Sequence, residues 1–367
     1  MKIAYYSYDH VSNPHCGGGG AYRDLMINRE LSSRHEIHCY YGAFKGCSLF
    51  AENGMRISFF GIPLTYLIGR ITYACFATVH SLFVRADIIV ICFSIFSPVF
   101  GFIVRKKKTV VELFHLARKE PLRKYSLFGL LPWLFEKTAV LFSRNILCIN
   151  TDVATYIKGH YKGKNIATIY TGFDQTLLSH DAGDDHYVLY LGRIDIHMKG
   201  LDVLCDAFER IASEFPGHRL IVAGRGSLHD TAWLRKRIAG SIIADRVIFR
   251  ENVSDQEKAD LLRRATFACM PSRFEGWCIS AIEAAACSKA TIGTRITGLS
   301  ESIIDGETGL LVPSEDAGAL AGAITLLLRD SELRLRLGRN GHQRARQFTW
   351  NALAQSHEEY YQSINAA

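Results

Sequence analysis

Short apolar segments alternate with stretches of helical periodicity along most of the chain. The apolar segments are rich in β-branched and aromatic residues and are bounded by turn-forming residues, which is typical of strands. Thirteen are expected, at residues 2–8, 36–42, 55–61, 87–93, 109–115, 146–150, 166–170, 187–192, 219–224, 246–252, 267–272, 290–294 and 309–313. Segments between them, such as 201–215 and 259–265, predict helices. Strands that alternate with helices indicate parallel α/β sheets.

Thirteen strands exceed the number usually found in a single open sheet. The pattern breaks at the polar, turn-rich segment "TGFDQTLLSHDAGDDH", residues 171–186. We therefore expect two doubly wound, Rossmann-like domains that face each other across a cleft. The first comprises residues 1–165 with a C-terminal helix at about 347–367, and the second comprises residues 166–346. Ligands of such sheets bind at the carboxyl ends of the strands, so the loops there carry most of the functional information.

Composition indicates a soluble globular protein in a reducing compartment. The 367 residues are 48% hydrophobic and 22% charged, and the ten cysteines show neither a C-x-x-C pair nor a zinc-type cluster. The first residues, "MKIAYYSY", read as a strand and not as a signal peptide. The uncharged segment 88–104 is long enough to approach a membrane span, but its Ser-Pro and Gly favour strand, helix and strand. A cytoplasmic location is expected.

Positive charge is concentrated in the first half of the chain. Residues 1–150 contain 18 Lys and Arg against 9 Asp and Glu, whereas residues 151–367 contain 25 against 27. Two interpretations remain open. The surplus is either a set of solvated side chains or a surface that meets an anionic partner such as nucleic acid, a membrane or a phosphorylated substrate.

Three loops carry candidate anion-binding chemistry. Consecutive glycines, Gly17 to Gly20, precede a predicted helix, where backbone N–H groups and the helix dipole favour a phosphate. This loop matches neither a P-loop nor G-x-G-x-x-G with its acidic partner, so a merely flexible loop remains an alternative. The second loop follows "YLGR" and supplies Arg193 and, six residues later, Lys199. A planar guanidinium and a compact ammonium at one strand end suit phosphate oxygens.

The third loop, "RFEGWCISAIE" at residues 273–283, places Glu275 before a predicted helix and Glu283 two turns inside it. Glu283 is positioned to accept the two vicinal hydroxyls of a ribose, and Glu275 the hydroxyls of another sugar. Taken alone, Glu275 is better explained by the helix dipole, which stabilises a carboxylate there by about 0.3–1 kcal/mol.

Residues 271–313 resemble the donor-site signature of the family-4 retaining glycosyltransferases of GT-B fold. The resemblance rests on the Glu-x7-Glu spacing, a Gly-rich turn and "DGETGLLV". Upstream, "YLGRIDIHMKG", "LIVAGRGS" and "RVIFRENVS" resemble the family's diphosphate loop, the next strand and turn, and the loop that reads the nucleobase. Looser matches in the first half are the glycine loop and "VVELFH", and the tail "FTWNALAQSHEEYY" resembles the C-terminal helix.

The resemblance implies a nucleoside-diphosphate sugar as donor, retention of anomeric configuration and no metal or other cofactor. Arg193 and Lys199 would stabilise the diphosphate leaving group, Glu275 would hold the donor sugar, and His115 would lie near the reacting carbon. The implied donor-binding residues are Gly18, Gly19, Gly224, Val253, Gly276, Trp277, Cys278, Ile279 and Glu283. The family motif usually reads Glu-Gly-Phe-Gly, so Trp277 and Cys278 imply a differently shaped sugar pocket. Thr171-Gly172 also replaces the usual Asn-Gly.

The acceptor is expected to bind the basic first domain. The run at residues 105–108 and the segment 117–137, where basic residues precede Leu, Phe and Trp, suit an interfacial helix at an anionic membrane. A core-facing helix with a solvated flank is the alternative. A lipid-linked or lipopolysaccharide-type acceptor in cell-envelope polysaccharide or glycolipid synthesis is expected, with a soluble small-molecule acceptor as the other possibility.

Three other classes explain fewer of these residues. An NAD-dependent oxidoreductase would share the Rossmann-like pattern, but the first glycine loop lacks its fingerprint. A glycogen-phosphorylase-like enzyme needs a much longer chain and a pyridoxal lysine. A nucleic-acid-binding protein would explain the basic half but not the two glutamates. The sequence does not specify the nucleobase, the donor sugar, the acceptor or the oligomeric state.

Overall fold

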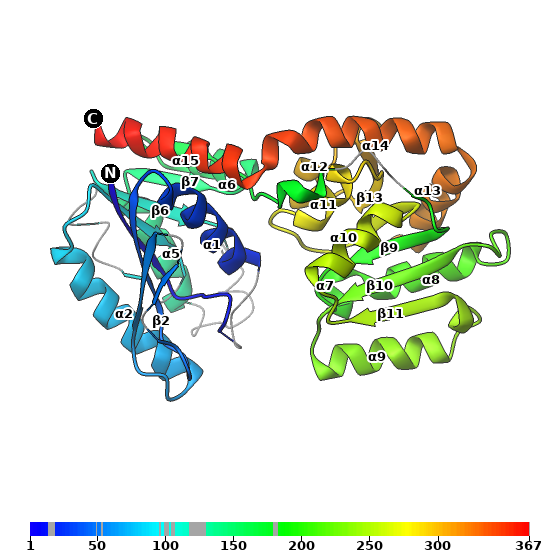
Figure 1. The fold of residues 1–367 in the computed structure, drawn as a ribbon, viewed down its shortest axis with the longest axis horizontal. Coiled ribbons are helices and arrows are strands. Elements are labelled where there is room, and N and C mark those ends of the chain that lie inside the picture. The colour runs from blue at the N-terminus through cyan, green and yellow to red at the C-terminus, as the bar shows by residue number, and fades with distance from the viewer. Residues whose placement is uncertain are drawn as a thin grey trace. The chain divides into compact units, whose positions relative to one another are not determined.

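The computed structural model describes residues 1–13, 19–48, 50–52, 54–94, 97–98, 103, 107–116, 130–178 and 183–366. The chain forms two compact units, which are described separately below (Figure 1). The first unit comprises Met1–Gly172 and Trp350–Ala367, and the second comprises Phe173–Thr349. The divisions expected from the sequence, after residues 165 and 346, fall a few residues earlier.

The strands described in the first unit form one eight-stranded sheet in the order β3-β4-β2-β1-β5-β6-β7-β8. All neighbours pair in parallel except β3 and β4. Their bounds are β1 Lys2–Ser7, β2 Glu36–Gly42, β3 Phe50–Glu52, β4 Met55–Phe60, β5 Ile88–Cys92, β6 Thr109–Leu113, β7 Asn145–Cys148 and β8 Asn165–Thr168. The central strands are buried on both faces, which explains their continuous apolar sequences.

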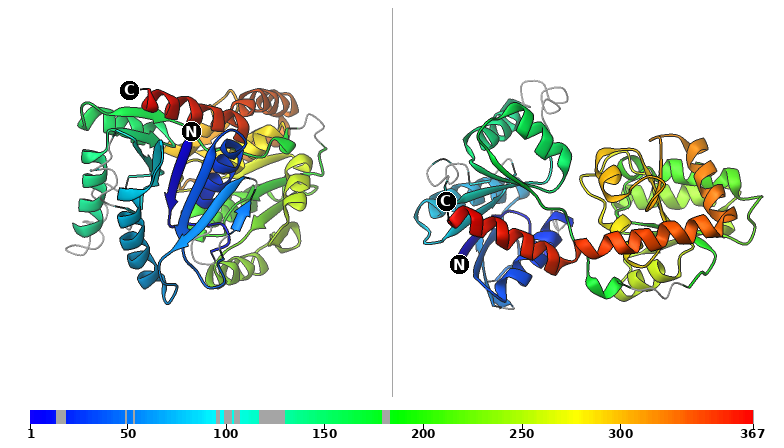
Figure 2. Two further views of the ribbon diagram at one scale, coloured as in Figure 1. Left: turned by 60° about the vertical axis from the view of Figure 1, so that its left-hand side comes forward. Right: turned by 90° about the horizontal axis from the view of Figure 1, so that it is seen from above.

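Helices cover both faces of this sheet. On one face, α1 (Gly19–Ser32) and the C-terminal α15 (Trp350–Asn365) pack in a core with Ile3 and Tyr5 of β1. Alternate residues of the same strand point to the other face, where α2 (Tyr66–Phe83), α5 (Leu130–Phe142) and α6 (Thr151–His160) share a second core. Figure 2 shows α15 running alongside α1.

A polar network is buried between β6 and the helices on the first of these faces. The Arg23 guanidinium of α1 forms an ion pair with Glu112 of β6 and donates to the Ile169 carbonyl at 3.2 Å. It also lies 3.2 Å from Nε2 of His357 in α15. Arg23, Glu112 and His357 are each 1% exposed. The network therefore links α1, β6, α15 and the residue that follows β8.

Two strand assignments differ from the sequence prediction. The segment 166–170 was expected in the second domain, but β8 pairs with β7 at the edge of the first sheet. Tyr360 of α15 reinforces this edge, because its hydroxyl donates to the carbonyls of Ile146 and Asn165. The short β3 was not expected at all. It pairs antiparallel with β4 as a hairpin, and three residues are too few to show a periodic pattern.

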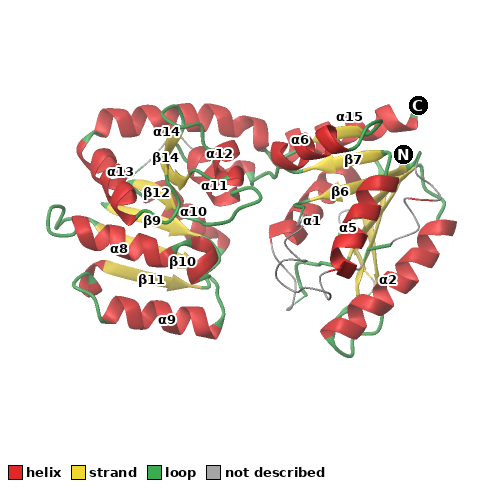
Figure 3. Ribbon diagram, turned by 180° about the vertical axis from the view of Figure 1, so that it is seen from behind, coloured by secondary structure: helices red, strands yellow, loops and turns green. Residues whose placement is uncertain are grey.

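The second unit contains a parallel sheet in the order β11-β10-β9-β12-β13-β14. Its strands are β9 Tyr187–Leu191, β10 Arg219–Gly224, β11 Val247–Glu251, β12 Phe267–Met270, β13 Thr291–Thr294 and β14 Gly309–Val312. Its helices are α7 Ile196–Lys199, α8 Leu201–Ile211, α9 Leu228–Ala239, α10 Asp255–Arg264, α11 Ile279–Ala286, α12 Thr297–Ser302, α13 Ala317–Arg329 and α14 Ser331–Ala345. Figure 3 shows helices on both sides of the strands in each unit.

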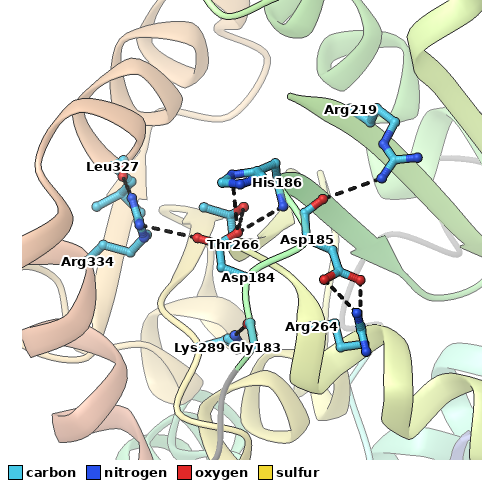
Figure 4. Close-up of polar contacts among 10 residues, drawn as sticks. All are labelled: Gly183, Asp184, Asp185, His186, Arg219, Arg264, Thr266, Lys289, Leu327 and Arg334. Carbon is cyan, nitrogen blue, oxygen red and sulfur yellow. Dashed lines mark hydrogen bonds and ion pairs between the residues drawn. The ribbon is translucent and has the colours of Figure 1, made fainter. Parts of the chain in front are cut away.

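A polar cluster fixes the amino-terminal edge of the second sheet (Figure 4). The Asp184 carboxylate accepts hydrogen bonds from the Thr266 hydroxyl at 2.6 Å and from the His186 backbone N–H at 3.0 Å. Asp185 pairs with Arg264 at 2.5 and 2.8 Å. These contacts hold the start of β9 beside the start of β12. The opposite, carboxyl-terminal edge carries the loops of the candidate site.

Several predicted features lie wholly or partly outside the described residues. These are the glycines before Gly19, most of the helix expected within 88–104, Arg105 and Lys106, and residues 117–129. The strands expected before and after that helix are confirmed as β5 and β6. Among the helices that the structure describes, none combines the length and the hydropathy needed to cross a bilayer.

Candidate functional site

The predicted cations lie on the loop that follows β9. Arg193 is held through its backbone, because its carbonyl accepts a hydrogen bond from the Tyr190 hydroxyl at 2.7 Å. Its guanidinium projects outward with 65% of the side chain exposed and lies 3.3 Å from Asp195. The Asp195 carboxylate also caps α7 by accepting from the Met198 N–H at 2.9 Å. The loop thus has a fixed backbone and an accessible guanidinium.

Two glycines allow the end of β10 to approach this loop closely. A Cβ at Gly224 would lie 1.7 Å from the Gly192 carbonyl oxygen, and one at Gly226 would lie 2.5 Å from the Ile194 carbonyl oxygen. Hydrogen bonds join the two segments, from the Gly192 N–H to Ala223 and from the Ile194 N–H to Arg225. Gly224 therefore shapes the backbone around Arg193, where a side chain would separate the two loops.

The structure brings Lys199 and Glu275 into direct contact. The Lys199 ammonium lies 2.5 Å from Glu275 Oε1, and the Ser272 hydroxyl donates to the same oxygen at 3.2 Å. The two side chains are only 17% and 13% exposed. Sequence analysis assigned them separate roles on separate loops and did not predict that they form a pair.

Packing between the two loops fixes this contact. Gly200 adopts a left-handed conformation with φ of 64°, and a Cβ there would lie 2.1 Å from the Pro271 carbonyl oxygen. Arg273 donates to both carboxylate oxygens of Asp202 at 2.8 Å and to the His197 carbonyl at 2.8 Å. A bidentate pair of this kind restrains orientation as well as distance. Arg273 is a positioning residue that the sequence analysis missed.

The segment from Gly276 to Ile279 leads into α11 and is tightly packed from behind. A Cβ at Gly298 would lie 2.5 Å from the Glu275 carbonyl oxygen, so α12 lies directly against this turn. The Trp277 ring is 6% exposed and packs on Phe348, with ring centroids 5.3 Å apart. The two residues at which the motif departs from its family, Trp277 and Cys278, are therefore buried components of the loop.

Cys278 occupies the N-cap position of α11, and its side chain makes no capping hydrogen bond. Burial, together with the nearby charge of Glu275, raises the pKa of the Cys278 thiol well above its ordinary value. The group is a neutral thiol at physiological pH and contributes packing volume. It is not an activated nucleophile.

Glu283 lies on α11 and is 6% exposed. It is the fifth residue of the helix, just over one turn from the start at Ile279, whereas the sequence analysis expected it two turns inside. Its Oε1 accepts a hydrogen bond from Lys258 of α10 at 2.9 Å. Lys258 was missed because its segment, "SDQEKADLL", has the pattern of an ordinary capped, solvent-exposed helix. The capping box between Ser254 and Glu257 is indeed present, and it fixes the first turn that carries Lys258.

Val253 lies between β11 and α10, where nucleobase contact was expected. The preceding Asn252 has a left-handed φ of 58°, and its N–H donates to the Gly224 carbonyl at 3.3 Å. The Val253 backbone is thus tied to the turn after β10. Within the second unit, the candidate residues therefore gather beyond the carboxyl ends of β9, β10, β11 and β12, on the loops and in the first turns of the helices that follow these strands.

The remaining predicted residues belong to the first unit. Gly18 lies outside the described residues, and Gly19 begins α1. The next residue, Gly20, packs against the Phe114 ring, since a Cβ there would lie 3.3 Å from Phe114 Cε2. His115 follows β6 with an exposed side chain, and partial desolvation by surrounding protein atoms lowers the pKa of its imidazole, which favours the neutral form near pH 7.

Comparison with known proteins gives a family match in the second unit. Residues 179–344 match the family model described as "Glycosyl transferases group 1". A glycosyltransferase of Methanocaldococcus jannaschii described as uncharacterized is 31% identical over 234 residues, 63% of either chain. The phosphatidyl-myo-inositol mannosyltransferase of Mycobacterium leprae is 33% identical over 178 residues, 48% of this chain and 46% of the relative. The matches thus span about half to two thirds of these relatives.

Similar solved structures cover the whole chain and establish the fold. Sucrose-phosphate synthase from Thermosynechococcus elongatus superposes with a TM-score of 0.82 over 100% of this chain and 99% of that one, at 22% identity. The Anabaena protein HepE, in complex with UDP and glucose, gives 0.78 over 99% and 100% at 18% identity. The predicted fold class is confirmed: two parallel-sheet, Rossmann-like α/β units of the GT-B kind.

Proposed function

We propose that the protein is a glycosyltransferase that moves a hexose-type sugar from a nucleoside-diphosphate sugar to an acceptor. The observation that carries this proposal is the 2.5 Å pair of Lys199 and Glu275, with Arg193 on the same loop as Lys199. A sugar nucleotide presents a polyhydroxylated ring next to a diphosphate. A carboxylate beside two cations offers acceptors to the hydroxyls and positive charge to the phosphates. The match of residues 179–344 to the family model supports the same conclusion.

In this proposal the cations stabilise the departing nucleoside diphosphate. Arg193 offers an exposed planar fork, and Lys199 adds a point charge fixed by Glu275. Negative charge on the diphosphate grows as the glycosidic bond breaks, so preorganised cations lower the barrier to that step. The residues supply this charge themselves, and we propose that transfer requires no metal ion or other cofactor.

The donor is held along the carboxyl-terminal edge of the second sheet. Glu275 accepts hydrogen bonds from sugar hydroxyls, and Glu283, oriented by Lys258, accepts those of the ribose. The nucleobase lies against the Val253 backbone, a mode of recognition that leaves no side-chain code for its identity. Backbone N–H groups at the start of α11, together with the backbone around Gly224, fix the sugar and phosphates.

The first unit contributes its glycine loop and His115, and its basic surface suits the acceptor. We propose that Gly18 and Gly19 approach the donor phosphates and that His115 contacts the donor sugar near the reacting carbon. We propose that the anomeric configuration is retained and that stabilisation of the leaving group by Arg193 and Lys199, rather than a protein base, assists the transfer. This assignment follows the family resemblance of the Glu275 to Glu283 motif and requires a product analysis.

A membrane-associated, cytoplasmic role suits the acceptor side. We propose a lipid-linked or other anionic acceptor in cell-envelope polysaccharide, lipopolysaccharide or glycolipid synthesis. Two observations support it: the basic first half of the chain, and similarity to a phosphatidyl-myo-inositol mannosyltransferase and to WaaG, a glycosyltransferase involved in lipopolysaccharide biosynthesis. If the sugar is transferred to a soluble small molecule and added lipid does not change the rate, the proposed acceptor is wrong, but the proposed glycosyltransferase activity is not.

The decisive experiment is a thermal-shift and hydrolysis screen across UDP-, GDP- and ADP-sugars, with NAD as a control. One nucleoside diphosphate and its sugar should raise the melting temperature and be hydrolysed slowly, equally well with or without a chelator. Glu275→Ala should abolish hydrolysis. Stabilisation by NAD alone would identify an oxidoreductase. Once an acceptor is found, nuclear magnetic resonance of the product reports whether configuration is retained.

A further inference from the structure

Helix α2 of the first unit is apolar on both its inner and its outer faces. Its inner face packs on the sheet through residues spaced four apart: Gly69, Tyr73, Ala77 and Ser81. The outer face of such a helix is normally polar. Here it exposes large apolar side chains at Leu67 (57%), Ile68 (40%), Ile71 (46%), Phe76 (54%), Val79 (59%) and Phe83 (77%). The preceding loop continues this surface with Ile62 (45%) and Leu64 (73%).

Charge is almost absent from this helix. Among Asp, Glu, Lys and Arg, α2 contains only Arg70, which pairs with Asp9 at 3.2 Å and lies over the Tyr8 ring. No carboxylate occurs anywhere from Ile62 to Ala86. Contiguous apolar surface on this scale is uncommon on soluble monomers and marks an interaction site.

A second helix on the same face of the sheet, α5, also exposes large apolar side chains, although it carries Glu136 and the exposed Lys137. Ala139 and Val140 of α5 share a core with Tyr73 and Ala77 of α2, so both helices cover one side of the sheet. Away from that core, α5 exposes Leu131 (57%), Leu134 (41%), Leu141 (49%) and Phe142 (45%). In Figures 1 and 3, α2 lies at the outside of the first unit.

We infer that this surface, the outer faces of α2 and α5, inserts into the interfacial layer of a bilayer that contains anionic phospholipid. An interfacial helix needs apolar side chains to enter the acyl region and nearby cations to meet the headgroups. Cations are available near the end of α2. Arg85 lies between α2 and β5, and Lys107 and Lys108 precede β6, which pairs in parallel with β5. All three side chains are exposed.

The charge of the first half favours a bilayer over a second copy of the chain. Residues 1–150 carry twice as many Lys and Arg as Asp and Glu, so two copies joined through α2 would bring like charges together. An anionic bilayer supplies the opposite charge. Because half of α2 is packed against the sheet, the helix lies along the membrane surface and does not cross it.

This inference specifies a partner for the membrane-associated acceptor in the proposed function. Its test needs neither donor nor acceptor, so either proposal can fail without the other. The probe is sedimentation with vesicles of phosphatidylcholine, with and without phosphatidylglycerol, at low and high salt. The protein should bind the anionic vesicles, and salt should weaken the binding.

A matched pair of variants assigns the binding to α2. Val79→Ser with Phe83→Ser removes two exposed apolar side chains from α2 and should weaken binding on the order of tenfold or more. Leu228→Ser with Ile242→Ser removes two side chains that are 90% and 85% exposed in the second unit, and should leave binding unchanged. Equal binding by both variants, or no binding by the native protein at low salt, would overturn the inference.

A probe on α2 reports insertion directly. Cys75 is exposed on this helix. With Cys16 and Cys47 replaced by Ser, an environment-sensitive dye on Cys75 should shift its emission to shorter wavelength when anionic vesicles are added. An unshifted dye, or sedimentation velocity that shows an α2-dependent dimer without vesicle binding, would contradict a membrane partner. Glu275→Ala should bind vesicles as the native protein does, because that residue lies in the donor site.

Discussion

Lys199 and Glu275 form an ion pair at 2.5 Å although 76 positions separate them in the chain. The pair joins the loop after β9 to the loop after β12, and both side chains are largely withdrawn from solvent. Each residue therefore sets the position of the other as well as the contact it makes with a donor. Variants of this pair should affect catalysis and loop stability together.

Lys199→Ala should reduce turnover on the order of 10²–10³-fold, because it removes a preorganised positive charge from the leaving group. It also leaves the Glu275 carboxylate partly buried without its cation, which should cost about 1–3 kcal/mol of unfolding free energy. Steady-state kinetics with the donor found in the nucleotide screen, together with denaturant unfolding, measure both effects.

The double variant tests whether the two residues act as a unit. Lys199→Ala with Glu275→Ala should lose far less than the product of the single losses, since each single change already disrupts the pair. Near-native turnover in either single variant would refute the site assignment. Arg235→Ala, which breaks the exposed pair of Arg235 and Glu251 in the same unit, serves as the control and should change little.

The pair of Lys258 and Glu283 makes a separate prediction about the nucleotide. Lys258→Ala should weaken nucleoside-diphosphate binding about tenfold, because the Glu283 carboxylate loses the hydrogen bond that orients it toward the ribose. Calorimetry with the ribo- and 2′-deoxyribonucleotide measures the effect. If Glu283 holds the ribose, Glu283→Gln should narrow the difference in affinity between the two nucleotides. An unchanged difference would place the ribose elsewhere.

The buried carboxylates of the first unit should respond to pH in opposite directions. Although burial opposes ionisation, the charge of Arg23, the nearby His357 imidazole and a hydrogen bond from the Tyr5 hydroxyl lower the pKa of Glu112 to about 2. The ionised Glu112 therefore stabilises the fold above its ordinary pKa, and this stability is lost as pH falls toward about 2. Glu112→Gln should cost about 3–5 kcal/mol at pH 7, and the deficit should shrink below pH about 4.5.

Asp24, next to Arg23, shows the contrary behaviour. Burial and the charge of Glu112 raise its pKa well above the ordinary value, so the folded protein retains a proton that the unfolded chain releases. The free energy of unfolding therefore falls as pH rises from the ordinary pKa of an aspartate toward the raised pKa of folded Asp24. Asp24→Asn should therefore gain stability relative to the native protein as pH increases.

Chemical unfolding over a range of pH checks both predictions. Glu36→Gln removes one partner of an exposed pair with Lys2 and should change stability by less than about 1 kcal/mol. If Glu36→Gln lowers the free energy of unfolding as much as Glu112→Gln does, the stabilising role of the buried network is contradicted.

The thiols should differ sharply in reactivity. Cys278 is 5% exposed and burial raises its pKa, whereas Cys75 is exposed. Alkylation of the native protein followed by mass spectrometry should modify Cys75 and spare Cys278 until the protein unfolds. Rapid modification of Cys278 would show that the turn before α11 opens readily.

The sequence predicted local features well because each depends on residues near in the chain. All thirteen expected strands occur, and Glu36–Gly42 and Arg219–Gly224 match to the residue. The placement of β8 failed because pairing with β7 is a tertiary contact, and periodicity does not specify which sheet a strand joins. The same limit applies to side-chain pairs. The motif indicated Glu283, but nothing local indicated that Lys258 of another helix would bind it.

The first unit is assembled from both ends of the chain. Trp350, Leu353, Tyr361 and Ile364 of α15 belong to the same core as β1 and α1, and His357 contributes to the network around Arg23. During synthesis these residues emerge from the ribosome only after the entire second unit, which is continuous from Phe173 to Thr349. The second unit can therefore fold first. The core of the first unit stays incomplete until α15 has been synthesised, although residues 1–172 are made earlier.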